Sequence, residues 1–76
     1  MKSAREMFEE LGWVYSGELT FNKTGHWGYA SIKFFKETKD FAYWSRDTYG
    51  DFGIIHLSTQ ELKAINKMCK QLGWIE

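Results

Sequence analysis

The same helix-ending motif occurs near both ends of this chain. Residues 7–13 read MFEELGW and residues 68–74 read MCKQLGW, so Met, Leu, Gly and Trp recur at identical spacing. A glycine just past the last helical residue supplies the left-handed backbone that ends many helices, and the Trp after it can fold back onto the helix. We therefore predict one helix at each end of the chain, and the residues between them must supply the rest of the fold.

Each of these helices also has a start signal. Ser3 with Glu6, and Ser58 with Glu61, have the spacing of a capping box, in which serine and glutamate satisfy two otherwise unpaired backbone amides. We expect the first helix to cover residues 4–11 and the second to run from its cap to the second glycine. The apolar faces that should pack on the core are Ala4, Met7, Phe8 and Leu11 in the first helix, and Leu62, Ile65, Met68, Cys69 and Leu72 in the second.

Between the helices the apolar period changes to two, which is the period of strands. Short runs of β-branched and aromatic residues are separated by turn residues. We predict strands at residues 14–21, 29–35 and 41–46, a turn at residues 22–25, and a short fourth strand at residues 54–57. Short connections favour antiparallel pairing, because parallel neighbours need a long crossover.

The expected fold class is α+β, in a single domain over residues 1–76. An antiparallel sheet of three to four strands carries both helices on one face. Alternation along the strand at 29–35 sends Ala30, Ile32 and Phe34 toward the helices, and Tyr29, Ser31, Lys33 and Phe35 to the other side. The second face of the sheet is then left without a covering layer.

Aromatic side chains are more numerous than so small a core can bury. Six Phe, four Trp and four Tyr make up 18% of the residues, and each aromatic buries about 150–250 Å². The surplus must lie at least partly on the surface, where Trp, Tyr and Arg are the residues that dominate protein interfaces. The predicted partner-binding residues are Trp27, Tyr29, Lys33, Phe35, Trp44 and Arg46. Such a surface suits a partner protein and a second copy of the chain equally well.

Groups for catalysis or metal binding do not cluster in the sequence. His26 and His56 are far apart, and Cys69 lies on a helical apolar stripe, where a cysteine is usually a small core residue. These three residues match no metal-ligand spacing. We therefore expect a protein that is not an enzyme, with no catalytic residues, no metal and no cofactor.

The charge balance and the single cysteine bear on partners and location. Ten basic and ten acidic residues give a net charge of zero, which is not the basic excess of a nucleic-acid module. One cysteine cannot form the internal disulfides that small secreted domains need. The chain also lacks a signal-peptide pattern and the roughly 18 apolar residues of a membrane span. We expect a cytoplasmic protein that does not contact membranes.

One strand offers an alternative function. Residues 28–34, GYASIKF, resemble the second ribonucleoprotein motif of RNA-recognition domains, which displays rings for base stacking. Trp27 stands where the motif has a basic residue, and Ser31 where it has a stacking aromatic. The alternative is a single-stranded nucleic-acid binder in which rings stack on bases and cations contact phosphates: Tyr29, Phe35 and Trp44 as rings, Lys33 and Arg46 as cations.

Both ends of the chain carry a family resemblance. AREMFEELGW at residues 4–13 and LSTQELKAINKMCKQLGW at residues 57–74 resemble small uncharacterised proteins encoded by phages and prophages of Gram-positive bacteria. Residues 32–34 share the likeness, whereas residues 41–52 depart from it. The resemblance implies a phage accessory protein of the bacterial host cytoplasm that binds a host or phage protein, for example as an inhibitor. It transfers no catalytic residue.

Overall fold

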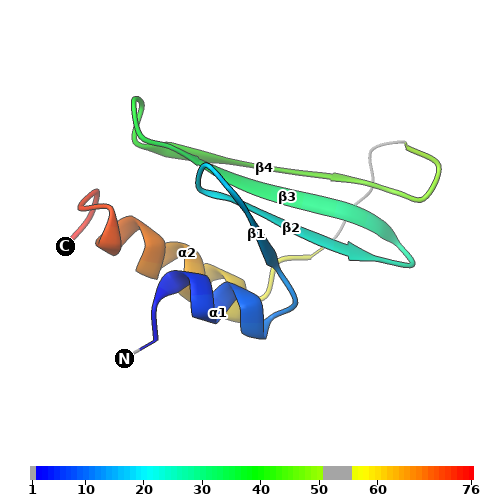
Figure 1. Ribbon diagram of the computed structural model, residues 1–76, viewed down its shortest axis with the longest axis horizontal. Coiled ribbons are helices and arrows are strands. Elements are labelled where there is room, and N and C mark those ends of the chain that lie inside the picture. Colours follow the sequence, from blue (N-terminus) through cyan, green and yellow to red (C-terminus); the bar gives the residue numbers. More distant parts are fainter. Residues whose placement is uncertain (1, 51–55) are drawn as a thin grey trace.

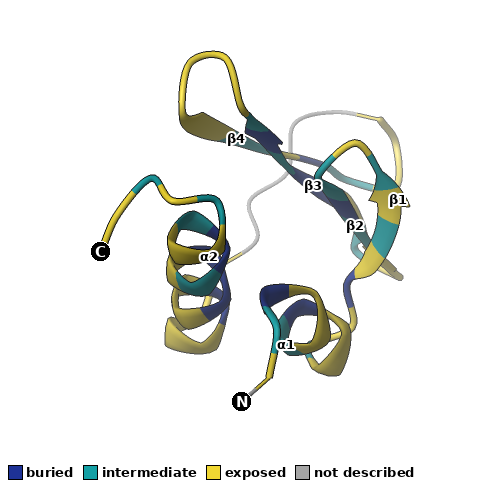
Figure 2. Ribbon diagram, turned by 60° about the vertical axis from the view of Figure 1, so that its left-hand side comes forward, coloured by how far each residue is buried: buried dark blue, intermediate teal, exposed yellow. Residues whose placement is uncertain are grey.

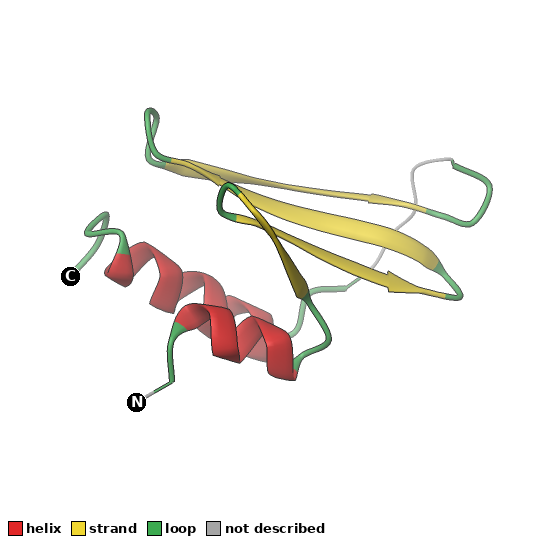
Figure 3. Cartoon of the chain, viewed as in Figure 1, coloured by secondary structure: helices red, strands yellow, loops and turns green. Residues whose placement is uncertain are grey.

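The computed structural model describes residues 2–50 and 56–76, in which two helices flank four strands in chain order. The elements are α1 (Ala4–Glu10), β1 (Val14–Gly17), β2 (Thr20–Gly25), β3 (Gly28–Phe35), β4 (Asp40–Arg46) and α2 (Thr59–Gln71). The strands form one antiparallel sheet in the order β1-β2-β3-β4, and both helices lie on the same side of it (Figure 1, Figure 3). The predicted α+β fold with both helices on one face is confirmed.

Both predicted capping boxes are present. The side chains of Ser3 and Ser58 each accept a hydrogen bond from the backbone N–H of the glutamate three residues later, and that glutamate accepts one from the serine N–H. These reciprocal bonds satisfy amides that a helix start would otherwise leave without partners. Because they are local in sequence, the starts of α1 and α2 could be read from four-residue patterns.

Both helices also end at the predicted glycines. Gly12 has a φ of 94° and Gly73 a φ of 77°. The N–H of Trp13 donates to the Phe8 carbonyl at 3.0 Å, and the N–H of Trp74 donates to the Cys69 carbonyl at 2.9 Å. This is the hydrogen-bond pattern of a Schellman stop. Each helix therefore ends by turning an indole back toward the core.

The stretch predicted as one strand at residues 14–21 is instead a hairpin of β1 and β2. Its two turn residues, Glu18 (φ 52°) and Leu19 (φ 56°), are both left-handed, a conformation that normally selects Asn and Gly. The Leu19 N–H donates to the Tyr15 hydroxyl at 3.1 Å, and the Leu19 carbonyl accepts from the Phe34 N–H at 3.0 Å. The prediction was wrong because these contacts, and not turn residues, hold the turn.

Two further predictions about the strands also need correction. Residues 22–25, predicted as a turn, continue β2 and pair with β3 down to Gly25 opposite Gly28. Residues 54–55 of the predicted fourth strand lie outside the described residues, and the described residues 56–57 are not in a strand. The sheet still has four strands, because the predicted first strand supplies two of them.

The core lies between the helices and the sheet (Figure 2). Phe8 is its centre: its ring stacks on Phe21 with centroids 4.3 Å apart and meets Trp13 and Phe34 edge-on at 6.1 and 6.3 Å. The buried hydrophobic residues are Ala4, Phe8, Trp13, Phe21, Ala30, Ile32, Phe34, Ala64, Ile65 and Met68. Ala30, Ile32 and Phe34 thus face the helices, as the alternation of β3 predicted.

The apolar stripe of α2 differs from the predicted one at a single position. Leu62 is 57% exposed, and Ala64 is fully buried in its stead. The buried face of the helix is centred on Ile65 and Met68, and Ala64 lies nearer that centre than Leu62 at 100° per residue. Ala64 lies on the same side of α2 as Gln71, whose side chain contacts α1, so a small side chain here lets the two helices approach each other.

The buried carboxylate of Glu61 links the two helices to the sheet. It accepts hydrogen bonds from the N–H and hydroxyl of Ser58, and from the Trp13 indole N–H at 3.4 Å. The Lys23 ammonium of β2 lies 3.9 Å away. Burial raises the pKa of Glu61, but the hydrogen bonds from Ser58 and Trp13 and the charge of Lys23 together outweigh burial, so the pKa lies below its usual 4.5. Glu61 is therefore ionised in the folded protein and is held by groups from three elements.

Replacing Gly73 by Ala should lower the free energy of unfolding by about 1–2 kcal/mol, because a Cβ is disfavoured in left-handed backbone. An added Cβ would meet nothing within 4 Å, so the loss reports backbone conformation and not a clash. Urea unfolding followed by circular dichroism measures it. Gly73→Asn is the matched control, since Asn tolerates this conformation and should lose less. Equal stability of Gly73→Ala and wild type would contradict a left-handed stop.

Replacing Glu61 by Gln should destabilise the protein at neutral pH by about 1–3 kcal/mol, since the amide keeps only one of the two acceptor oxygens that Ser58 and Trp13 use and loses the charge. The folded pKa of Glu61 is lowered, so its contribution is complete above the usual 4.5 and is lost as pH falls through the folded value. The stability difference between wild type and variant should therefore shrink in acid. Glu10→Gln, at an exposed carboxylate, is the control. A difference for Glu61→Gln that stayed constant with pH would refute the charged role.

Candidate functional site

The side of the sheet that faces away from the helices forms the candidate site, and we call it the open face. No element of the described chain covers it (Figure 1, Figure 2). Cross-strand partners share a face, so the register assigns its rows: Asn22, Ser31 and Trp44 in one, Thr20, Lys33 and Ala42 in the next, and Thr24, Tyr29 and Arg46 in a third. Val14 of β1 extends the first row beside Asn22.

Five of the six predicted partner-binding residues lie together on the open face. Tyr29 is directly opposite Arg46, and Trp44 is opposite Ser31, one row from Lys33. Phe35 ends the same side of β3, and its ring lies 5.4 Å from the Lys33 ammonium. The alternation of side chains along β3 thus places Tyr29, Lys33 and Phe35 on one surface. The pairing of β3 with β4 adds Trp44 and Arg46 to it.

Trp27 is the exception. Its side chain is half-buried and packs against the core cluster, so it does not join the open face. The indole folds over Gly25, where an added Cβ would come within 2.5 Å of the Trp27 Nε1. The tight turn between β2 and β3 therefore uses this ring to close the end of the core.

The rings on the open face are accessible to solvent. Tyr29 is 43% exposed, Trp44 is 36% exposed and Val14 is 66% exposed. Lys33, Phe35 and Arg46 are half-buried. Large apolar side chains on a surface normally cost free energy unless something covers them. Because these side chains lie on one face, a single partner could cover several of them and remove them from water together.

A hydrogen-bonded ladder of small polar residues crosses the middle of the open face. The Asn22 amide N–H₂ donates to the Ser16 hydroxyl at 2.9 Å, and its oxygen accepts from the Ser31 hydroxyl. Ser31 itself is only 5% exposed. These bonds fix the Asn22 side chain on both sides. The sequence analysis did not predict Asn22 and Val14 as site residues. For Asn22, a small polar residue near aromatic ones in a strand was the signal that could have indicated it.

A hollow of about 450 Å³ adjoins one end of the open face. Lys33 and Phe35 of the open face line it, together with Tyr15, Leu19 and Lys36. It lies where β3 extends past the start of β2, beside the strained turn between β1 and β2. The candidate site therefore combines a flat ring-bearing surface with a concave edge.

Other chemically reactive residues lie apart from this face. His26 and His56 are exposed, and Cys69 is half-buried on α2, where burial raises the pKa of its thiol. Within residues 2–50 and 56–76, no three or more His, Cys, Asp or Glu side chains form a group that could hold a metal ion. No helix in the described part of the chain is long and apolar enough to cross a membrane.

No protein-family model matches the chain, and neither a curated protein nor a solved structure shows significant similarity to it. The assignment of a function therefore depends on the geometry of the open face.

Proposed function

We propose that this protein acts by binding a partner protein through the open face and has no catalytic activity of its own. The observation that carries the proposal is the register of β3 and β4, which aligns two exposed rings, Tyr29 and Trp44, with the half-buried cations Lys33 and Arg46 on the face that no described element covers. Aromatic residues and Arg supply most hot spots of protein interfaces. Tyr29, Trp44 and Arg46 occupy adjacent positions of this kind.

The hydrogen bonds within the open face support the same proposal. Binding is weakened when side chains must be ordered, at a cost of about 0.5–1.5 kcal/mol for each flexible side chain. Here a regular β ladder carries the rings, and the Ser16–Asn22–Ser31 hydrogen bonds hold the surface between them. Trp44 covers the middle row and is the expected centre of the contact.

The resemblance of the chain ends to phage and prophage proteins suggests which partner to seek. We propose a host or phage protein of the bacterial cytoplasm, whose functional surface the open face would cover. The protein would then act only by covering the functional surface of its partner, as an inhibitor does. The positive charges of Lys33 and Arg46 fit a partner surface that carries carboxylates beside an apolar patch.

Replacing Trp44 by Ala should remove the partner from a capture experiment. Tagged wild-type protein, Trp44→Ala and Tyr49→Ala are used as baits in nuclease-treated lysate of a Gram-positive bacterium. Tyr49 is the matched control because it is 89% exposed but lies after β4, outside the paired rows that define the open face. We expect one protein to bind wild type and Tyr49→Ala and to bind Trp44→Ala at least about tenfold more weakly, a loss of about 1.4 kcal/mol.

The captured protein is then purified and titrated against the same three baits, after circular dichroism shows that all are folded. Equal binding to wild type and Trp44→Ala would contradict the proposal, since the central ring would then contribute nothing.

A second candidate function is single-stranded nucleic-acid binding, which the pairing of rings with cations favours. Tyr29 is opposite Arg46, and Lys33 lies over Phe35, so two of the three rings have a cation beside them. Base stacking on such rings should quench tryptophan fluorescence, with an affinity that falls as salt rises. Titration with short oligonucleotides at low salt measures this. Unchanged fluorescence, with no binding by anisotropy, would exclude this candidate and leave protein binding.

A further inference from the structure

On the outer surface of the helix layer, away from the sheet, acidic residues outnumber basic ones along α1, whereas the lysines lie on α2. The exposed acidic residues of α1 form an acidic ridge, Glu6, Glu9 and Glu10, in which Lys2 and Arg5 pair with two of the three carboxylates. The lysines of α2 form a basic ridge: Lys63 and Lys70 are exposed opposite the buried stripe, and Lys67 is half-buried on the side toward α1. The spacings of three and four residues keep each ridge on one helical face. The layer thus presents two parallel strips of opposite charge.

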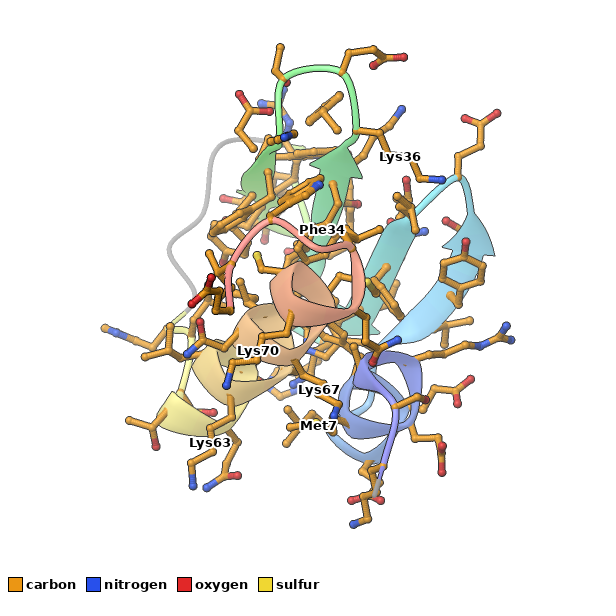
Figure 4. All side chains as sticks on the ribbon, turned by 90° about the vertical axis from the view of Figure 1, so that its left-hand side faces the viewer. Met7, Phe34, Lys36, Lys63, Lys67 and Lys70 are labelled. Carbon is orange, nitrogen blue, oxygen red and sulfur yellow. The ribbon has the colours of Figure 1, made fainter. Side chains whose placement is uncertain are left out.

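The two helices run antiparallel, side by side. The Ala4 N–H at the start of α1 donates to the Gln71 side chain at the end of α2, at 2.6 Å. At the other end, Leu11 and Gln60 line a common hollow of about 140 Å³ with Met7. Figure 4 shows Met7 between the helices, Lys63 on the side of α2 away from the sheet, and Lys67 extending from α2 toward α1. We call the line between the two helices the seam; Met7 and Leu11 lie along it, and Lys2 and Glu10 also line its hollow.

We propose that two copies of this chain associate through the helix layer, about a two-fold axis that runs along the seam parallel to the helices. Rotation about that axis lays the acidic ridge of each copy over the basic ridge of the other and brings the two Met7 side chains together. A two-fold axis across the helices would oppose like charges and is disfavoured. Self-complementary contact of this kind is what an isologous interface requires.

The charges available on each ridge are consistent with this pairing. Within the described residues, Lys63, Lys67 and Lys70 make no ion pair with their own chain. Glu9 and Glu10 pair with Arg5 and Lys2, but these pairs are exposed. Exposed pairs contribute little, so they can be exchanged for contacts with a second copy. The association is expected to be weak, salt-dependent and independent of the open face, which it leaves pointing outward on both sides.

Sedimentation equilibrium tests the dimer directly. At about 0.01 M salt, where the Debye length is about 30 Å, we expect a monomer–dimer equilibrium, and at about 1 M salt, where it is about 3 Å, a dimer at least tenfold weaker. Trp44→Ala should dimerise like wild type. A protein that stays monomeric at low salt up to millimolar concentration, or a dimer lost in Trp44→Ala, would overturn the proposal.

Charge reversal supplies the sharper test. Lys63→Glu/Lys70→Glu makes both ridges acidic, and Glu9→Lys/Glu10→Lys makes both basic, so each variant alone should be monomeric. Mixed one to one, they should form a heterodimer, because each layer now faces its opposite. The substituted residues are exposed, and thermal melting checks that they fold; the neutral pair Glu9→Gln/Glu10→Gln should weaken dimerisation if the basic variant does not fold. Variants that still self-associate, or a mixture that does not associate, would refute the pairing of ridges.

Discussion

The buried carboxylate of Glu61 is the interaction on which the arrangement of helices and sheet depends. It joins the start of α2, the indole that ends α1 and the ammonium of β2 at one point. A buried charge of this kind is stable only with several donors around it. Here Ser58 at the start of α2, Trp13 between α1 and β1, and Lys23 of β2 supply them. Both helices are consequently held against the same face of the sheet.

The exposed face follows from that constraint. Side chains alternate along a strand, so a sheet covered by helices on one side must send half of its residues to the other side. In β3 and β4 three of these outward positions carry aromatic rings: Tyr29, Phe35 and Trp44. The hydrogen bonds through Asn22 stabilise a polar strip between them. Burying one side of the sheet under the helices therefore leaves the aromatic residues of the other side without a cover in the described part of the chain. This surface is the basis of the proposed function.

Local rules made the helices and the open face predictable, whereas contacts between distant residues decided the rest. Ser3, Gly12 and their counterparts in α2 act on backbone groups a few residues away, so four-residue patterns sufficed. The alternation of side chains along β3 predicted on which side of the sheet Tyr29 and Phe35 lie. The hairpin turn escaped detection because Leu19 is held by Tyr15 and Phe34. Trp27 was assigned to the surface because nothing local signals that its ring folds over Gly25.

The central claim is that Tyr29 and Trp44 face water in the free protein, and solvent paramagnetic relaxation measures this directly. A soluble gadolinium chelate is added to the isotopically labelled protein, and the relaxation of side-chain protons is followed by NMR. The account predicts strong enhancement for the Tyr29 and Trp44 rings and little for the buried rings of Phe8 and Trp13. Protection of Tyr29 and Trp44 to the level of Trp13 would mean that the face is already covered, and would contradict the account.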